Sequence, residues 1–197
     1  MLPNVSLRER ARIVLGGKIF KNEWMYAVVL VLAISAVNGL ASTTVVLPLL
    51  TMGVVNFAAA RYFLLRVRNS NYHYNIFKFE WDLRYHIIDN VILGILSSLI
   101  ILLFSLLLIV PGVIKACSYS MAYYIKCDNP EISAMDALAL SKRMMDGHKM
   151  QYFRLQLSFI GWYIVGLLCL GVGVFWVSAY NHAANAAFYE EVSHVRI

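Results

Sequence analysis

Long apolar segments alternate with short polar ones along this chain of 197 residues. No Asp, Glu, Lys or Arg occurs in residues 24–60, 90–114 or 155–189. One helical crossing of a membrane needs about 20 apolar residues, so the first and last of these segments are long enough for two short crossings each. Both carry turn-forming residues near the middle, Asn38-Gly39 in the first and Gly171-Val172-Gly173 in the last.

This pattern predicts an all-α fold, a polytopic transmembrane helix bundle of about six spans arranged as three hairpins, in a single domain. The predicted spans are 24–41, 45–65, 90–110, 113–126, 153–170 and 174–189, in hairpins at 24–65, 90–126 and 153–189. Pro111-Gly112 divides the second hairpin, because proline removes a helix donor. The fourth span covers only about 21 Å at about 1.5 Å per residue. A complete crossing and a re-entrant segment that returns to the same side are therefore both open.

Composition and charge agree with a membrane location. Hydrophobic residues make up 60% of the chain and charged residues 14%, against about 45–50% and about 25% in soluble domains. This excludes a disordered chain, a basic nucleic-acid-binding domain and an ordinary soluble enzyme. The basic residues gather before the first span and in the loops after the second and fourth. The positive-inside rule then predicts a multi-pass protein of the cytoplasmic membrane with both termini in the cytoplasm.

Three polar segments are predicted to lie at the inner membrane surface. Residues 6–17 read as an amphipathic helix that begins with a Ser6–Glu9 capping box, and 66–89 as an interfacial loop rich in aromatic residues. Residues 133–147 read as a second amphipathic helix, with a Ser133–Asp136 capping box and Gly147 as its C-terminal cap. The candidate lipid-headgroup contacts are Arg8, Arg10, Arg12, Lys115, Lys142 and Arg143.

The apolar face of the second amphipathic helix has a serine at its centre. This face is predicted to hold Ala134, Ala137, Leu138, Ser141, Met144 and Met145. The Ser141 hydroxyl would bond either its own helix backbone or a polar group elsewhere in the bundle.

A few polar residues fall inside the predicted spans, where burial in lipid is costly. They are Asn56, Asn181, His182 and Asn185. Asn181 and Asn185 are four residues apart and share a helix face. This cluster is a candidate polar site facing the bundle interior, or a set of hydrogen bonds between helices. No metal site or cofactor is predicted, since Cys117, Cys127 and Cys169 lack metal-ligand spacing.

Several strings in residues 107–191 resemble the DUF975 family. They are Ile109-Val110-Pro111-Gly112-Val113-Ile114-Lys115, Asp128-Asn129-Pro130, Ser141-Lys142-Arg143-Met144-Met145-Asp146-Gly147-His148-Lys149 and Phe188-Tyr189-Glu190-Glu191. The resemblance implies a small bacterial integral membrane protein of unassigned function. A shorter likeness, around the second amphipathic helix, is to the membrane domain of glycerophosphodiester phosphodiesterases.

The residues favour a non-enzymatic accessory, scaffold or regulator in the bacterial cytoplasmic membrane. Its expected partners are membrane lipids, with another membrane protein or a second copy of the chain, and no nucleic acid. The alternative is a small transporter or channel for lipid, peptide or ion. A third option is a membrane enzyme acting on lipids, for which the available interfacial residues are Asp82, His86, Asp89 and His148.

Overall fold

The computed structural model describes residues 4–14, 27–29, 31–32, 46–68, 87–168 and 173–194, and all regular secondary structure in this part is helical. The predicted all-α class is therefore confirmed. The predicted turns at 38–39 and 171–172, and most of the predicted interfacial loop, lie outside the described residues. The helices are α1 (Asn4–Val14), α3 (Val46–Arg68), α5 (Ile87–Leu107), α6 (Ile109–Tyr119), α7 (Ala122–Asp128), α8 (Ala134–Met144), α9 (Lys149–Leu168) and α10 (Gly173–His194).

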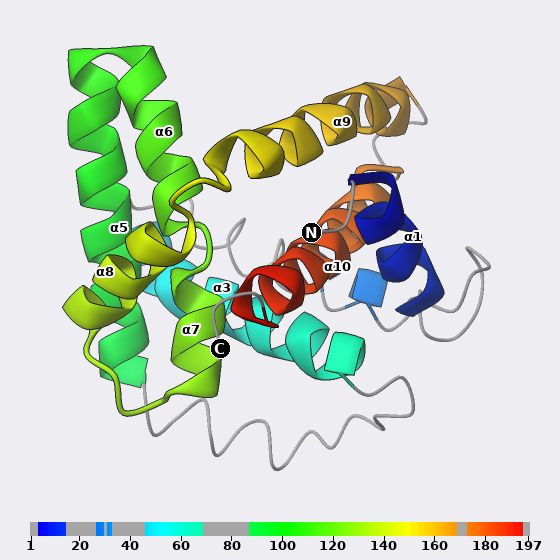
Figure 1. Ribbon diagram of the computed structural model, residues 1–197. Helices are drawn as coiled ribbons and strands as arrows, with labels where there is room; N and C mark the ends of the chain where they lie inside the picture. The colour runs from blue at the N-terminus through cyan, green and yellow to red at the C-terminus, as the bar shows by residue number, and fades with distance from the viewer. Residues whose placement is uncertain are drawn as a thin grey trace.

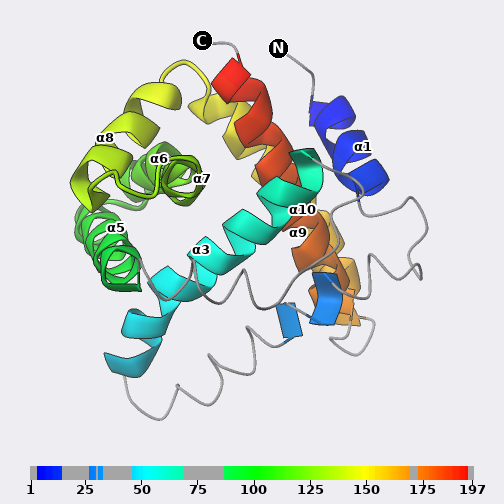
Figure 2. The same cartoon turned by 90° about the horizontal axis from the view of Figure 1, so that it is seen from below.

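These helices form two groups that share α3. Helices α5, α6, α7 and α8 pack together, and α1 and α9 pack against α10 (Figures 1 and 2). Helix α3 contacts α5 and α7 in the first group and α10 in the second. The α5–α6 hairpin stands away from the rest of the chain at its turn (Figure 1).

The turn between α5 and α6 consists of one extended residue, Leu108, with φ −162° and ψ 140°. The predicted break at Pro111-Gly112 is thus displaced by three residues. Pro111 instead occupies the first turn of α6, where a missing N–H costs nothing. Gly112 is needed here, because a Cβ built on it would overlap Ser105 of α5.

The segment predicted as the fourth span, 113–126, is not one helix. Helix α6 has 11 residues and ends at Tyr119, and α7 starts at Ala122 and has 7 residues. Ser120 and Met121 separate them, both in right-handed backbone conformations. At about 1.5 Å per residue, α6 is about 16 Å long.

Helix α8 lies within the second predicted amphipathic segment and packs against the end of α6. Ser133 is its N-cap, and the Ser133 hydroxyl accepts a hydrogen bond from the Asp136 amide at 3.1 Å. Of the predicted apolar face, Ala134, Ala137, Leu138, Ser141 and Met145 are buried. The helix ends at Met144 and its C-cap is Met145, two residues before Gly147, the predicted cap. Gly147 has a φ of +81° and follows in the turn after the helix.

Two partners are predicted for the Ser141 hydroxyl, its own helix backbone or a polar group elsewhere in the bundle, and the structure shows the second. Its Oγ donates to the carbonyl oxygen of Ser118 at 2.8 Å, in a buried position. Ser118 lies in the last turn of α6, where carbonyl groups have no acceptor role left in the helix. Helix α8 therefore supplies a hydrogen-bond donor to a carbonyl group in the last turn of α6.

Helix α1 begins at Asn4, so Ser6 lies inside the helix and is not the N-cap that the sequence suggests. Leu7 and Ala11 are fully buried, as expected for its apolar face. The Tyr180 hydroxyl of α10 donates to the carbonyl of Arg8 at 2.9 Å. Helix α1 is thus part of the packed bundle, against α10.

One helix among the described residues is long and apolar enough to cross a membrane. It covers Ile87–Leu106 with a mean hydropathy of 2.4, and 22% of its apolar window is buried inside the chain. The other five predicted spans stay predictions.

The crossing of α3 and α5 depends on two glycines. A Cβ on Gly94 would lie 2.6 Å from the Gly53 Cα. We expect Gly94→Ala to lower the free energy of unfolding by about 1–3 kcal/mol, because the helices must separate. Gly161→Ala is the control, since no atom lies within 4 Å of the new Cβ. Thermal unfolding followed by circular dichroism measures both. Equal melting temperatures for the two variants would contradict the close approach.

Candidate functional site

A polar cavity of about 240 Å³ lies where α3, α5, α6, α7, α9 and α10 meet. Hydroxyl, amide and imidazole groups supply its polar lining: Asn56, Ser97, Ser98, Tyr119, Ser120, Tyr123, Tyr124, Tyr152, His182 and Asn185. Among the described residues that line it there is no carboxylate, ammonium or guanidinium group. The cavity therefore suits neutral hydrogen-bonding groups.

Three of the four predicted polar residues come together in this cavity. Asn56 arrives from α3, and His182 and Asn185 from α10. The Tyr123 hydroxyl lies within hydrogen-bonding reach of Asn56 and Ser97. Asn56 and His182, which are 126 positions apart in the sequence, thus lie in the wall of the same cavity. The tyrosines and serines that complete the lining were missed, because such residues are common in any sequence.

Asn181 and Asn185 both bond α9. The Gln156 amide donates to Asn185 Oδ1 at 2.6 Å, and the Asn181 amide donates to the Tyr163 hydroxyl at 3.4 Å. Asn181 is not among the residues that line the cavity, and its buried Oδ1 has no hydrogen-bond partner within the described part of the chain. Asn181 and Asn185 therefore form hydrogen bonds between α10 and α9. Such bonds between helices are the second of the two roles predicted for these residues.

His182 packs on an aromatic ring at the cavity wall. Its ring is stacked on Phe63 of α3, with the centroids 5.5 Å apart and the planes inclined by 12°. The contact joins α10 to α3 and fixes how the imidazole faces the cavity.

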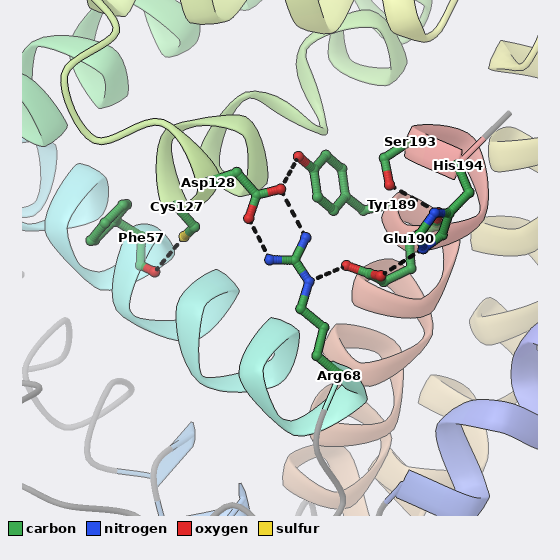
Figure 3. Close-up of polar contacts among 8 residues, drawn as sticks. All are labelled: Phe57, Arg68, Cys127, Asp128, Tyr189, Glu190, Ser193 and His194. Carbon is green, nitrogen blue, oxygen red and sulfur yellow. Dashed lines mark hydrogen bonds and ion pairs between the residues drawn. The ribbon is translucent and has the colours of Figure 1, made fainter. Parts of the chain in front are cut away.

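A second polar cluster surrounds Arg68, the last residue of α3 (Figure 3). Its guanidinium donates to both carboxylate oxygens of Asp128 at 2.6 and 2.8 Å, and to Glu190 at 2.5 Å. The Tyr189 hydroxyl donates to Asp128 at 2.7 Å. Four charged or polar side chains thereby tie the ends of α3, α7 and α10 together. A hollow of about 720 Å³ lies beside them.

Electrostatics in this cluster favour the charged form of Arg68. The hydrogen bond to Asp128 raises the pKa of Arg68 above its ordinary value, with partial burial opposing and the bond to Glu190 adding to the rise. His194 Nε2 lies 3.4 Å from the second Glu190 oxygen, so it adds a positive charge there when protonated. Sequence reasoning placed Arg68 in a cytoplasmic basic segment and missed its partners, which lie 60 and 122 positions away.

A lysine is fully buried at the end of α7. Lys126 Nζ donates to the carbonyl of Ile132 at 2.5 Å and to Asp89 of α5 at 3.2 Å. The side chain has no exposed surface, whereas that of Asp89 is 47% exposed. The sequence places Lys126 at the end of the predicted fourth span, and in the structure it joins α7 to the start of α5.

The predicted headgroup contacts have different surroundings. Arg12, Lys142 and Arg143 are exposed, and Arg10 is exposed and lies 4.0 Å from Glu191. Arg8 is half-buried on α1. Lys115 differs from the expectation, because its Nζ lies over the rings of Phe104 and Tyr119, at 4.5 and 5.8 Å from their centroids. It forms cation–π contacts within the α5–α6 hairpin.

The described residues contain no group of three or more His, Cys, Asp or Glu side chains that could hold a metal ion. Cys117 and Cys127 are free thiols, and Cys169 lies outside the described residues. Burial raises the pKa of the Cys127 thiol above its ordinary value. That thiol instead contacts the carbonyl of Phe57 at 3.9 Å (Figure 3).

The family resemblance carried by residues 107–191 is matched by a comparison with protein families. The model of the family described as "Protein of unknown function (DUF975)" matches residues 76–196. The chain belongs to the DUF975 family. No curated protein and no solved structure matches it. The likeness to the glycerophosphodiester phosphodiesterase membrane domain receives no support. Membership of the DUF975 family carries no activity with it, because the family is described as being of unknown function.

The Arg68 cluster should contribute measurably to stability. We expect Arg68→Gln to lower the free energy of unfolding by about 1–3 kcal/mol, because Asp128 and Glu190 lose a charged donor. The side chain of Arg68 is 41% exposed, which places the effect toward the lower end of that range. Chemical denaturation of the purified protein measures the change.

The matched control is Arg154→Gln, which removes the same charge from an exposed position on α9. It should change stability by less than about 0.5 kcal/mol. A double-mutant cycle of Arg68→Gln with Asp128→Asn should give a coupling energy above about 0.5 kcal/mol. Additive effects would show that the cluster does not act as a unit.

Proposed function

We propose that this DUF975 protein is an integral protein of the bacterial cytoplasmic membrane that works without catalysis, as an accessory, scaffold or regulator. The observation that carries the proposal is the turn of the α5–α6 hairpin. Leu106, Leu108, Ile109 and Val110 are 84%, 65%, 79% and 69% exposed there. A turn in water normally carries polar residues, so this one is suited to hydrocarbon or to another apolar surface.

The outer half of α9 supports the same location. Ile164, Val165, Leu167 and Leu168 are all between 53% and 79% exposed. Figure 1 has this end of α9 and the turn of α5–α6 on the same side of the chain, whereas α7 and the Arg68 end of α3 lie on the other. Both apolar ends thus lie away from the Arg68 cluster, which favours their insertion into a membrane.

For the second hairpin we favour the re-entrant arrangement over two full crossings. Helix α6 runs for only about 16 Å before the interruption at Ser120 and Met121, whereas the hydrocarbon core is about 30 Å thick. An entirely apolar turn also fits better inside the membrane than at the outer surface. Helix α5, with 21 residues and a length of about 30 Å, would then lie tilted in the membrane so that its end stays inside. In this proposal the hairpins at 24–65 and 153–189 cross completely, and both termini stay cytoplasmic.

The expected partners are membrane lipids, together with a membrane protein or a second copy of this chain. A small transporter is the second candidate function, favoured by the neutral polar cavity of about 240 Å³ among apolar helices. Such a cavity would bind an uncharged solute, because burying an ion there would leave its charge without a partner.

Cysteine labelling tests this topology. In a cysteine-free background, Ser42→Cys and Val172→Cys should react with a membrane-impermeant maleimide in intact cells. Asp146→Cys should react only after the membrane is permeabilised, because α8 faces the cytoplasm. Val110→Cys should react in neither case, because water is scarce in hydrocarbon.

Two results would contradict the proposal. Labelling of Val110→Cys in intact cells would show that the hairpin crosses completely. Release of the protein from membranes by alkaline carbonate, without detergent, would show that it is not an integral membrane protein at all.

A further inference from the structure

An apolar groove runs along α6 and meets the first turns of α9. It has a volume of about 320 Å³, and its walls include Val110, Val113 and Cys117 of α6 with Met150 and Phe153 of α9. From Ile109 to Cys117 the groove follows α6 for about 12 Å. Its shape and lining suit an extended hydrocarbon chain.

A basic hollow adjoins this groove at the start of α9. It has a volume of about 310 Å³ and is lined by Lys142, Arg143, Asp146 and Lys149. Three cations and one carboxylate leave a net positive charge. Lys149 lines both the hollow and the groove, so the two are neighbours that meet at this side chain.

We propose that these two hollows together form a binding site for one anionic phospholipid. The phosphate lies among Lys142, Arg143 and Lys149, and one acyl chain lies along α6. This inference rests on the membrane location proposed above. Charge complementarity identifies the ligand, since a phosphodiester carries the negative charge that the hollow lacks and its acyl chain supplies the apolar surface that the groove needs.

The arrangement of charges separates this ligand from simpler ones. Free inorganic phosphate would satisfy the cations and leave the groove empty. A zwitterionic lipid would bring a second cation close to Lys142 and Lys149. Asp146 lies 3.6 Å from Lys149 and is 79% exposed, and it is the one carboxylate among the residues that line the hollow, so the three cations keep an excess of positive charge for a phosphate.

Native mass spectrometry of the full chain in detergent tests the site with phosphatidylglycerol and phosphatidylcholine of identical acyl chains. We expect one saturable phosphatidylglycerol site, at least about tenfold tighter than phosphatidylcholine. Lys149→Gln should weaken phosphatidylglycerol binding about fivefold and the Lys142→Gln/Lys149→Gln double variant about 25-fold, at about 1 kcal/mol per cation. Phosphatidylcholine binding should stay the same.

Arg154→Gln is the matched control, because it removes an equal charge from α9 outside both hollows. It should leave phosphatidylglycerol binding within twofold of the native chain. Val113→Trp, and separately Met150→Trp from the opposite wall, should fill the groove and weaken phosphatidylglycerol binding while the cations remain.

Four outcomes would overturn the site: equal binding of the two lipids, equal losses for Lys149→Gln and Arg154→Gln, undiminished binding in both folded tryptophan variants, or displacement of the lipid by millimolar inorganic phosphate. Each of these leaves the proposed membrane location intact if the protein still needs detergent to stay in solution. A protein that is soluble without detergent would overturn the membrane proposal itself.

Discussion

The hydrogen bond between Ser141 and the Ser118 carbonyl holds α8 against the point where α6 ends. It gives a partner to a carbonyl that the helix end leaves open, in a buried position where a lost partner would be costly. Because α8 is fixed there, its exposed Lys142 and Arg143 line the same hollow as Lys149 at the start of α9. The placement of α8 beside α6, and with it the proposed lipid site, depends on this contact.

Five charged side chains form links between helix ends. Arg68 joins α3 to Asp128 of α7 and Glu190 of α10, and Lys126 joins α7 to Asp89 of α5. In an all-helical chain with so few charges, these links restrict how the two helix groups pack through α3. All five lie outside the apolar turn of the α5–α6 hairpin, as the proposed insertion of that turn requires.

The sequence predicts the class of the fold and the local features of α8 well, since hydrophobic periodicity and capping are properties of neighbouring residues. It predicts the buried face with Ser141 at its centre, but it could not identify Ser118 as the partner, 23 positions away. It places the break of the second hairpin at Pro111, because proline lacks the N–H group that a helix interior needs. The chain breaks earlier, at Leu108, so that Pro111 falls in the first helical turn. The group of Asn56, His182 and Asn185 could be predicted because polar residues are rare in apolar segments. The Arg68 cluster could not be predicted, because it depends on tertiary packing that no local pattern encodes.

The depth of the α5–α6 turn in the membrane tests the account most directly. A nitroxide spin label at Leu108, in a cysteine-free chain reconstituted into lipid vesicles, reports its collision rates with oxygen and with a water-soluble nickel complex. The account predicts high accessibility to oxygen and very low accessibility to nickel at this position, and the reverse for a label at Asp146. High accessibility of the Leu108 label to the nickel complex would contradict it, because the turn would then lie in water.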